Sequence, residues 1–377
     1  MAIRKLAIIS SQAFSIVNFR GPLIVALAKK GVTIHALAPD FDEELRRRVT
    51  ELGAIPVDYE LARTGLNPAG DLGAVWSLTR TLRRIGPDAT LGYFIKPVIY
   101  GSIAAWIAGI PRRYSLIEGL GFVFANDSGA RGARRRLLRA LVGRLYRFAL
   151  ARNHRVIVLN QDDIDTLADA GILDPRKAVL IPGTGVDLQH YTVTPIPLHP
   201  LTFLLVARML REKGVCEFVD AARTIKRDRP DVRFVLVGGI DPNPGSVSAR
   251  ELEGWVEEGV IEWAGQVSDV RPWFAQASVF VLPSYYREGI PRGNQEAMAS
   301  GRPVITTDWV GCRETVDDNV NGLLIPVRDT PALIAAMRRY VDEPELVQRH
   351  GLAGRRLAEQ RFDVREINRQ FLEVLEV

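Results

Sequence analysis

The stretch that decides the fold is VFVLPSYYREGIPRGNQEAMASGRPVITTD, residues 279–308. It opens with an apolar run at 279–282 and closes with a β-branched run at 304–306, which is the pattern of buried parallel strands. Between the two runs, Pro291 suits the first turn of a helix and Gly301 suits the position just past a helix end. The stretch therefore predicts a strand, a polar loop, a helix and a second strand, the repeating unit of an α/β protein.

The same alternation of short apolar runs and helical patterns extends over the whole chain. The runs lie at residues 6–10, 32–38, 89–94, 114–118 and 156–160 in the first half, then at 203–207, 234–238, 261–264, 279–282 and 304–306. Near-continuous apolar strands need helices on both faces of their sheet. We therefore expect an α/β protein of two doubly wound, Rossmann-like domains with a cleft between them.

A proline-rich segment, LQHYTVTPIPLHP at residues 188–200, separates the two series of strands. Its three prolines disfavour regular structure, so the segment predicts a linker or hinge. Residues 1–190 then form an N-terminal domain and residues 191–361 a C-terminal domain. The final residues, 362–377, carry apolar side chains at helical spacing and predict a helix that docks on the folded protein.

Composition excludes several classes of protein. Of the 377 residues, 47% are hydrophobic and 25% charged, which supports neither a disordered nor a fibrous protein. Two cysteines, Cys216 and Cys312, lack the spacing of a zinc site or a disulfide framework. The most membrane-like window, residues 91–110, is interrupted by Lys96, Pro97 and two glycines, so a strand followed by a helix explains it better. We expect a cytoplasmic, globular protein.

Positive charge is concentrated in the first half of the chain. Residues 1–190 hold 26 lysines and arginines against 17 aspartates and glutamates, a net charge of +9, which leaves −4 for the remainder. Residues 131–155 contain nine arginines and no acidic residue, interleaved with leucine, tyrosine and phenylalanine. This pattern predicts a cationic amphipathic helix that binds an anionic membrane surface. The arginines expected to face lipid are Arg134, Arg135, Arg136 and Arg139.

Two other interpretations of residues 131–155 remain open. The arginines form a solvated helix face in the simpler one. Nucleic-acid binding is disfavoured, because only Tyr146 and Phe148 could stack on bases and no known binding module is present.

Two glutamates in the decisive stretch are candidates for binding a sugar. Glu288 follows the strand at 279–282, and ligands bind at the carboxyl ends of strands in open α/β sheets. Glu296 lies on the helix behind it, with seven residues between the two. Carboxylates only accept hydrogen bonds, so they suit the vicinal hydroxyls of sugars and ribose. Solvated surface charges are the alternative, which the neighbouring glycines and prolines make less favourable.

Two cations follow the first strand of the second half. Arg208 and Lys213 lie near the carboxyl end of the strand at 203–207, and Gly214 opens the next helix. An arginine fork, a lysine point charge and a helix N-terminus together suit a diphosphate. Taken alone, an arginine and a lysine five residues apart are more often surface solubilisers, but the Glu288 segment favours the binding interpretation.

These motifs together resemble those of family 4 retaining glycosyltransferases of the GT-B fold. The matching motifs are Arg208 with Lys213, Glu288-x7-Glu296, Gly-Cys-Arg-Glu at 311–314 and IPGTGVD at 181–187. A second set is similar to the bacterial branch that extends undecaprenyl-diphosphate-linked sugars: SIVNFRGPLIVAL at 15–27, RTGLNP at 63–68, IEGLG at 117–121 and VLVGGIDPNP at 235–244.

The resemblance implies a role for each matching residue. The expected donor contacts are Arg208 and Lys213 with the diphosphate, Glu288 with the transferred sugar, Glu296 with the ribose, the amides of Gly289 and Ile290 with phosphate or sugar, and Gln266 and Val267 with the nucleobase. It implies no enzyme nucleophile, no cofactor and no metal. The sequence agrees on the metal, because Asp163-Ile164-Asp165 lies at an apparent helix start, where capping explains it. The family pattern also places the last helix on the first domain.

The first domain departs from the family pattern in the region expected to bind the acceptor. No Gly-Gly pair follows the first strand, where this chain has SSQAFS at residues 10–15. Lys96 and Glu118 at strand ends, with Arg20 beyond the first strand, are the remaining acceptor candidates. A lysine that extends to solvent and a capping glutamate are the simpler explanations of the first two.

The sequence therefore predicts a glycosyltransferase. We expect it to move a sugar from a nucleotide donor, with UDP favoured and GDP not excluded, to a lipid-diphosphate-linked saccharide at the inner face of the cytoplasmic membrane. The alternatives are a nucleotide-sugar epimerase or hydrolase of the same fold, or a non-catalytic protein that binds nucleotide-sugar or anionic lipid. A nicotinamide oxidoreductase is disfavoured because no G-x-G-x-x-G turn follows the first strand.

Overall fold

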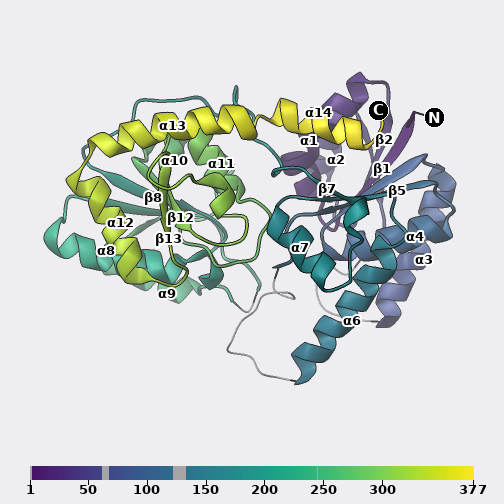
Figure 1. Ribbon diagram of the computed structural model, residues 1–377, viewed down its shortest axis with the longest axis horizontal. Coiled ribbons are helices and arrows are strands. Elements are labelled where there is room, and N and C mark those ends of the chain that lie inside the picture. The colour runs from purple at the N-terminus through teal and green to yellow at the C-terminus, as the bar shows by residue number, and fades with distance from the viewer. Residues whose placement is uncertain (1, 62–67, 122–132, 244) are drawn as a thin grey trace. The chain divides into compact units, whose positions relative to one another are not determined.

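The computed structural model describes residues 2–61, 68–121, 133–243 and 245–377, and gives only the backbone of 68–69 and 133–139. The chain divides into two compact units (Figure 1): unit 1 comprises residues 1–184 and 364–377, and unit 2 comprises residues 185–363. The chain first passes from unit 1 to unit 2 after residue 184, six residues before the boundary expected after residue 190. The two units confirm the expected α/β fold class.

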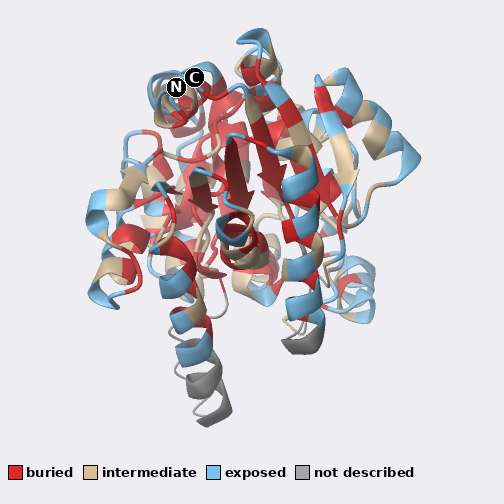
Figure 2. Ribbon diagram, turned by 90° about the vertical axis from the view of Figure 1, so that its right-hand side faces the viewer, coloured by how far each residue is buried: buried red, intermediate tan, exposed pale blue. Residues whose placement is uncertain are grey.

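In the described part of unit 1, seven parallel strands form one sheet in the order β3-β2-β1-β4-β5-β6-β7. The strands are β1 (Lys5–Ile9), β2 (Thr33–Ala38), β3 (Ala54–Asp58), β4 (Ala89–Tyr93), β5 (Arg112–Ile117), β6 (Arg155–Val158) and β7 (Ala178–Leu180). Figure 2 shows the central strands buried and the exposed residues mostly on the outward faces of the helices. This is the burial expected of a doubly wound sheet.

The helices of unit 1 cover both faces of its sheet. They are α1 (Ala13–Lys29), α2 (Glu43–Glu51), α3 (Pro68–Ile85), α4 (Ser102–Ile107) preceded by the π-helix η1 (Pro97–Gly101), α6 (Ala133–Leu150), α7 (Gln161–Asp169), the 3₁₀-helix η2 (Pro175–Lys177) and α14 (Val364–Val374). The C-terminal helix α14 packs against α1 and belongs to unit 1. Its buried face contains Val364, Ile367 and Phe371.

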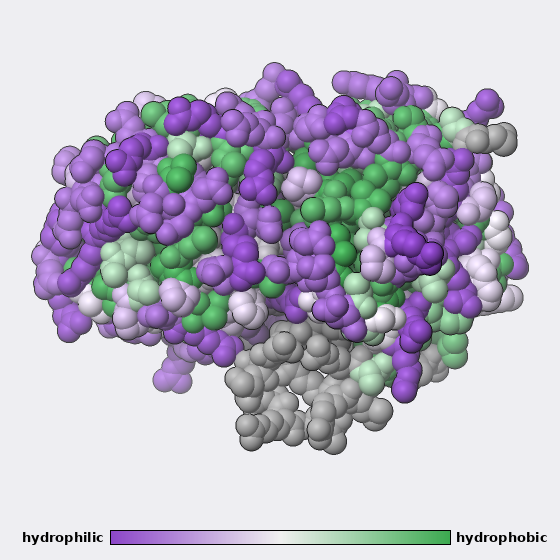
Figure 3. All heavy atoms as spheres, viewed as in Figure 1, coloured by the Kyte–Doolittle hydropathy of each residue, from purple (hydrophilic) through white to green (hydrophobic). Residues whose placement is uncertain are grey.

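In the described part of unit 2, six parallel strands form a second sheet in the order β10-β9-β8-β11-β12-β13. The strands are β8 (Thr202–Val206), β9 (Arg233–Val237), β10 (Glu262–Trp263), β11 (Val279–Leu282), β12 (Val304–Thr307) and β13 (Gly322–Ile325). The helices are α8 (Val215–Asp228), α9 (Ala249–Glu257), α10 (Arg271–Gln276), α11 (Arg292–Ala299), α12 (Thr330–Asp342) and α13 (Glu345–Arg361), with 3₁₀-helices η3 (Arg211–Lys213) and η4 (Arg313–Thr315). On the face of this unit that Figure 3 shows, hydrophilic residues predominate, with hydrophobic patches between them.

The decisive stretch folds as β11, α11 and β12, with a polar loop before the helix. Strands β11 and β12 pair in parallel, with Phe280 opposite Val304. Helix α11 begins directly after Pro291 and ends before Gly301, whose φ of +75° gives the left-handed turn that closes many helices. The expected strand, loop, helix and strand are confirmed.

Three strands, β3, β7 and β13, have no counterpart among the sequence expectations. Each is an edge strand with a neighbour on only one side. Strand β3 contains Pro56 and is mostly half-buried or exposed, and β7 has three residues, of which Leu180 is exposed. Strands β3 and β7 are therefore less buried than the central strands, whereas β13 (GLLI) is mostly buried and its short apolar run was not recognised. The other ten strands begin and end within two residues of their predicted positions.

The predicted linker at residues 188–200 is bound to unit 2. The guanidinium of Arg302 is fully buried and donates to the carbonyl oxygen of Thr194 at 2.9 Å and to its hydroxyl at 2.6 Å. From α13, Arg355 donates to the carbonyl oxygen of Tyr191 at 2.8 Å. The three prolines prevent regular structure, as expected, but these arginines hold the irregular backbone in place. The segment is part of the second unit and not a free linker.

Unit 2 begins and ends at the same place. The backbone amide of Val186 donates to the carbonyl oxygen of Phe362 at 2.8 Å, and Val186 forms a parallel bridge with Asp363. The two crossings of the chain between the units are therefore neighbours. In the described ranges, no helix has both the length and the apolar composition needed to cross a membrane.

Candidate active site

A close backbone approach joins the segments that follow β8 and β11. Gly214 has a φ of +78°, and a Cβ atom there would lie 2.3 Å from the carbonyl oxygen of Pro283. The backbone amides of Tyr285 and Tyr286 donate to the carbonyl oxygen of Glu212 at 2.8 and 3.0 Å. Only glycine fits this crossing. It brings the segment containing Lys213 against the loop that contains Glu288.

Lys213 and Glu288, which are 75 residues apart in sequence, form an ion pair at this crossing. The ammonium Nζ of Lys213 lies 2.6 Å from Oε2 of Glu288, and the two side chains are 11% and 17% exposed. The other carboxylate oxygen of Glu288 accepts a hydrogen bond from the Ser284 hydroxyl at 3.2 Å. The structure thus brings together two of the three residues expected to act in catalysis.

Arg208 forms a second ion pair at the end of β8. Its Nη1 lies 2.8 Å from Oδ2 of Asp241, which follows β9. The ring centre of Tyr286 lies 5.9 Å from the Arg208 guanidinium and 5.5 Å from the Lys213 ammonium. An aromatic ring at this distance attracts cations. Tyr286 therefore lies beside both of the expected diphosphate-binding residues.

The loop after β12 supports the backbone beside Glu288. Gly311 has a φ of +77°, and a Cβ atom there would lie 1.9 Å from the carbonyl oxygen of Gly289. The next residue, Cys312, is buried, and burial together with the Glu288 carboxylate raises the pKa of its thiol to about 12. A thiol that stays protonated at neutral pH is a poor nucleophile. The Gly-Cys-Arg-Glu motif therefore shapes the loop and supplies no thiolate there.

Glu296 is buried behind the loop and held by two donors. Its Oε1 accepts from the Tyr191 hydroxyl at 2.8 Å and from Nε of Arg292 at 2.8 Å. Burial and the neighbouring carboxylate raise the pKa of Tyr191, so its hydroxyl remains a donor. These contacts fix the carboxylate in one orientation, and Glu296 is not a solvated surface charge.

Gln266 and Val267 follow β10 at the same edge of the sheet. Oε1 of Gln266 would lie 2.9 Å from a Cβ atom added to Gly239, so its side chain passes the end of β9. The carbonyl oxygen of Gly239 accepts from the Met209 amide at 3.0 Å. The loops after β8, β9 and β10 are therefore adjacent. Gln266 is exposed and Val267 half-buried.

In unit 1, two of the expected acceptor residues form one pair. The guanidinium of Arg20 on α1 forms an ion pair with the Glu118 carboxylate after β5, and their side chains are 2% and 16% exposed. The guanidinium also lies 4.8 Å from the ring centre of Tyr93. Burial raises the pKa of Glu118, an effect that the charge of Arg20 opposes. Oε2 of Glu118 is buried, with no hydrogen-bond partner among the described residues.

Lys96 forms a separate buried pair in unit 1. Its ammonium lies 3.0 Å from Oδ1 of Asp71 on α3, and the Tyr100 hydroxyl donates to the other oxygen of Asp71 at 2.9 Å. Lys96 is 12% exposed. It therefore does not extend to solvent, which corrects the simpler explanation of this lysine.

The side chains of the expected lipid-facing residues lie outside the described part of the chain. They belong to the first half of α6: Arg134, Arg135, Arg136 and Arg139. In the second half of the helix, Val142, Tyr146 and Leu150 are buried, whereas Leu141 and Phe148 are exposed. Among the side chains that the structure describes in α6, these three therefore pack in the core of unit 1, and Leu141 and Phe148 face solvent.

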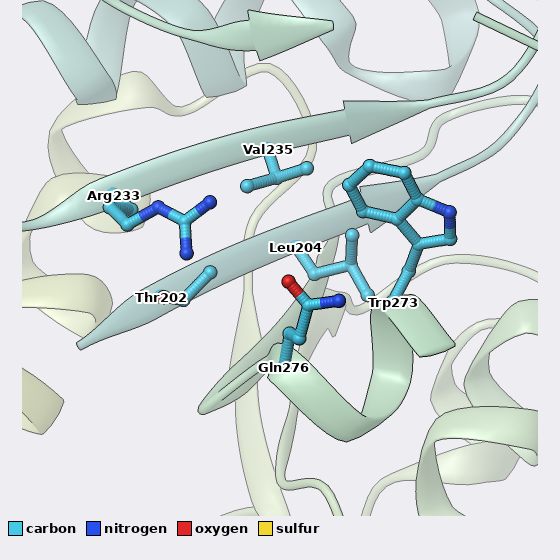
Figure 4. Close-up of a pocket in the computed structure, with 6 residues that line it drawn as sticks. All are labelled: Thr202, Leu204, Arg233, Val235, Trp273 and Gln276. Atoms are coloured by element: carbon cyan, nitrogen blue, oxygen red, sulfur yellow. The ribbon is translucent and has the colours of Figure 1, made fainter. Parts of the chain in front are cut away.

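A separate small pocket lies at the opposite edge of the sheet of unit 2 (Figure 4). Its volume is about 10 Å³, room for about one water molecule, and it is lined by Thr202, Leu204, Arg233, Val235, Trp273 and Gln276. Thr202 and Arg233 begin their strands, so the pocket lies away from Arg208 and Gln266. It is smaller than the roughly 300 Å³ of typical ligand sites. Within the described ranges, no group of three or more His, Cys, Asp or Glu side chains could hold a metal ion.

Two protein-family models match the chain, one in each unit. The model described as "Glycosyl transferase 4-like domain" matches residues 19–184, and the model described as "Glycosyl transferases group 1" matches residues 200–343. The chain is a family 4-like glycosyltransferase. The match in the second unit spans the loops that contain Arg208, Lys213 and Glu288.

This glycosyltransferase is similar to curated bacterial enzymes over most of its length. It is 28% identical, over 91% of its own length and 90% of the relative, to the N,N'-diacetylbacillosaminyl-diphospho-undecaprenol α-1,3-N-acetylgalactosaminyltransferase of Campylobacter jejuni. It is 26% identical, over 73% of its length and 72% of the relative, to the UDP-Gal:α-D-GlcNAc-diphosphoundecaprenol α-1,3-galactosyltransferase of Escherichia coli.

Solved structures confirm the fold of this glycosyltransferase. A sucrose-phosphate synthase of Thermosynechococcus elongatus superposes with a TM-score of 0.80 at 21% identity, covering 99% of this chain and 98% of the other. HepE of Anabaena in complex with UDP superposes with a TM-score of 0.76 at 18% identity, covering 99% of both chains.

Asp241, Tyr191 and Tyr286 are among the residues at the site that were not recognised from the sequence. Asp241 lies within the VLVGGIDPNP motif, but the motif alone gave it no role. Tyr191 lies in the proline-rich segment, and Tyr286 two residues before Glu288. Tyrosines and an aspartate in polar loops carry no distinct signal without the backbone path that brings them to a partner. The one clue to Asp241 in the sequence was that it belongs to a matching motif in which it had no assigned role.

Proposed function

We propose that this glycosyltransferase moves a sugar, with retention of anomeric configuration and without a metal, from a UDP-linked donor to a saccharide carried on a lipid diphosphate. The observation that carries the proposal is the contact between Lys213 and Glu288. This contact joins, at the carboxyl ends of β8 and β11, the cation that we propose binds phosphate and the carboxylate that we propose binds hydroxyls. The names of the two relatives support the acceptor class, and that of the E. coli enzyme supports a UDP-linked donor.

Arg208 and Lys213 bind the donor diphosphate in this proposal. When the bond from the anomeric carbon to the phosphate oxygen breaks, its electron pair moves to that oxygen and the diphosphate gains negative charge. Fixed cations stabilise this charge more in the transition state than in the ground state. Arg208 is half-exposed and Lys213 has further N–H groups beyond the one directed at Glu288, so both can meet a diphosphate.

The remaining donor contacts are those that the family resemblance implies. Glu288 accepts hydrogen bonds from hydroxyls of the transferred sugar, and Glu296 accepts them from the ribose. The amides of Gly289 and Ile290 contact phosphate or sugar, while Gln266 and Val267 flank the nucleobase. This arrangement agrees with the adjacency of the loops after β8, β9 and β10.

Unit 1 binds the acceptor in this proposal, through Arg20, Glu118 and Lys96. The acceptor hydroxyl oxygen bonds to the anomeric carbon on the face that the diphosphate leaves, and its proton passes to the leaving phosphate oxygen. No enzyme nucleophile takes part. The buried, unpartnered Oε2 of Glu118 supports a role for this carboxylate in accepting a hydroxyl hydrogen bond.

An assay of donors and acceptors tests the proposal. The purified protein is incubated with a panel of UDP- and GDP-sugars, with and without a lipid-diphosphate-linked saccharide, and the anomeric configuration of the product is determined by NMR. Sugar transfer only when acceptor is present, unaffected by EDTA, is the expected result. Release of free sugar would indicate a hydrolase, a changed donor sugar an epimerase, and binding without turnover a non-catalytic protein.

We also propose that unit 1 binds the anionic inner face of the cytoplasmic membrane through α6. Juxtamembrane basic residues contribute about 1 kcal/mol each near an anionic surface, so half of the nine arginines in residues 131–155 give roughly 4 kcal/mol. Farther along the helix, Phe148 and Trp106 of α4 are 41% and 45% exposed, with ring centres 6.0 Å apart. The guanidinium of Arg152 lies 3.4 and 4.4 Å from these rings. Exposed aromatic rings beside arginines suit the headgroup region.

Co-sedimentation with vesicles tests membrane binding. The wild-type protein is expected to bind vesicles rich in phosphatidylglycerol at low salt and to be released at high salt. Replacing Arg134, Arg135, Arg136 and Arg139 by alanine should abolish most of this binding. The matched control replaces four partly exposed arginines of unit 2, Arg223, Arg229, Arg233 and Arg338, which should leave binding intact. If the protein does not bind anionic vesicles even at low salt, the arginines form a solvated helix face and the proposal of membrane binding is wrong.

A further inference from the structure

We infer that Asp241 is a positioning residue for Arg208, and that the loop after β9 holds the Asp241 carboxylate in place. The inference rests on the donor site proposed above. It concerns a carboxylate that contacts one of the diphosphate-binding cations directly, and it gives the VLVGGIDPNP motif a function. The geometry of the ion pair, the bonding of the loop and the sign of the charge each bear on it.

The two members of the ion pair differ in exposure. Nη1 of Arg208 lies 2.8 Å from Oδ2 of Asp241, but Arg208 is 50% exposed and Asp241 only 9%. A half-exposed arginine with several rotatable bonds samples many rotamers unless something holds its end. A buried carboxylate is the fixed partner of such a pair. Asp241 therefore determines where the guanidinium lies, and not the reverse.

The loop that carries Asp241 is bonded to the segment that carries Arg208. Oδ1 of Asp241 accepts from the Asn243 amide at 2.9 Å, which fixes the carboxylate from the other side. The Asp241 amide donates to the Ser246 hydroxyl at 3.2 Å, and that hydroxyl donates to the carbonyl oxygen of Met209 at 3.0 Å. The Arg211 amide donates to the carbonyl oxygen of Gly245 at 2.9 Å. Met209, next to Arg208, and Arg211 are thus both hydrogen-bonded to this loop.

The charge of Asp241 opposes the function of the site unless it positions Arg208. A carboxylate beside a diphosphate-binding cation repels the diphosphate and weakens its binding. Orientation acts in the other direction, because a guanidinium already fixed in place loses less freedom when it meets the donor. An arginine has five N–H groups, so a contact through Nη1 is compatible with a diphosphate bound by others. The two effects predict opposite signs when the charge alone is removed.

A double-mutant cycle with nucleotide binding tests the inference. UDP and GDP affinities are measured by calorimetry for wild type, Asp241→Asn, Arg208→Ala and the double variant, and kcat is measured wherever transfer occurs. Asp241→Asn should weaken nucleotide affinity and lower kcat by about five- to tenfold each, the size of one charge-assisted hydrogen bond. In the Arg208→Ala background, the same substitution should no longer weaken nucleotide affinity or lower kcat, because the positioning effect passes through Arg208 and only the repulsion of the diphosphate remains to be relieved.

The matched control is Asp231→Asn, which removes the partner of Arg229 in an exposed pair of the same unit. It should leave affinity and kcat unchanged. Unchanged or tighter nucleotide binding by Asp241→Asn overturns the inference, because repulsion is then the whole effect of the carboxylate. Equal losses with and without Arg208 also overturn it, since Asp241 then acts on the fold.

The same measurements distinguish a failure of the proposed function from a failure of this inference. Wild-type protein that binds UDP or GDP but transfers no sugar contradicts the proposed reaction, and the affinity cycle still decides the role of Asp241. Wild-type protein that binds neither nucleotide overturns the donor site and this inference with it.

Discussion

In each sheet, an ion pair lies near the carboxyl ends of the strands, and the two pairs differ in their exposure to solvent. In unit 1, Arg20 and Glu118 are 2% and 16% exposed, whereas in unit 2 Arg208 is 50% exposed beside a buried Asp241. A buried pair has lost its hydration on both sides, so each charge depends on the other. A half-exposed cation keeps room for a further anion. The carboxyl ends of the strands in unit 2 therefore suit a diphosphate, whereas the buried pair in unit 1 stabilises its own unit in addition to its proposed contact with the acceptor.

Arg20→Ala should have the largest effect on stability, because it leaves the buried carboxylate of Glu118 without its partner. We expect a loss of about 3–5 kcal/mol in the free energy of unfolding, measured by urea denaturation. The control is Arg46→Ala, which breaks an exposed pair with Asp58 and should cost at most about 1 kcal/mol. Replacing both members, as Arg20→Met with Glu118→Leu, should restore most of the loss. Equal stability of Arg20→Ala and wild type would remove the contrast between the two ion pairs.

Arg208→Ala and Lys213→Ala should each lower kcat/KM by about 10²-fold or more. That is the effect of losing a charged transition-state contact of roughly 3 kcal/mol. Asp241 keeps its hydrogen bond from the Asn243 amide when Arg208 is removed, so Arg208→Ala should lower the melting temperature less than Arg20→Ala does. Steady-state kinetics and thermal unfolding of the same preparations check both statements. Near-wild-type rates in both variants would refute the diphosphate assignment.

The two glutamates of the decisive stretch should separate in their kinetic effects. Glu288→Ala should mainly lower kcat, because the contact with the transferred sugar strengthens as the bond to the phosphate breaks. Glu296→Ala should mainly raise the donor KM, since a ribose contact is made in the ground and transition states alike. Measuring both constants over a range of donor concentrations distinguishes the cases. An effect of Glu288→Ala on KM alone would show that Glu288 has a different role.

Tyr191→Phe should have the smallest effect, a rise in donor KM of about fivefold with kcat unchanged. It removes one of the two hydrogen bonds that orient the Glu296 carboxylate, a contribution of about 1 kcal/mol. The control is Tyr340→Phe, which breaks a buried hydrogen bond to His350 elsewhere in unit 2 and should alter stability but not donor KM. An unchanged KM in Tyr191→Phe would mean that Arg292 alone suffices to hold Glu296.

The sequence was sufficient for the central strands of both sheets and for the edge strand β10, but not for the other three edge strands. A central parallel strand is buried on both faces, so it needs an apolar run that stands out, as in residues 279–282. An edge strand such as β3 is shielded on one side only and tolerates Pro56 and exposed side chains. The boundary between units was displaced for a related reason. Prolines mark irregular backbone, but they do not reveal that buried Arg302 binds that backbone to unit 2.

At the candidate site, residue types and strand ends were predictable and partners were not. Arg208, Lys213 and Glu288 follow strands, and strand ends in a parallel sheet meet at one edge, so their proximity followed from the fold class. The partners Asp241 and Tyr191 are 33 and 105 residues from Arg208 and Glu296. Nothing in a linear pattern connects such positions. Their pairing depends on loop paths that include crossings only glycine permits, such as Gly214 against Pro283.

Unit 2 is one continuous segment of the chain inserted in unit 1, here called a cassette, and the bridge between Val186 and Asp363 joins its two ends. Its first and last residues are hydrogen-bonded neighbours, so an exchange of this cassette between related enzymes needs two junctions at a single point on the molecule. Helix α14 would stay with the host, because it packs against α1. Such a chimera keeps one intact core in each unit, and its donor preference should follow the cassette while its acceptor preference follows the host. Recombination at these two junctions offers a route by which new pairs of donor and acceptor arise without redesign of either sheet.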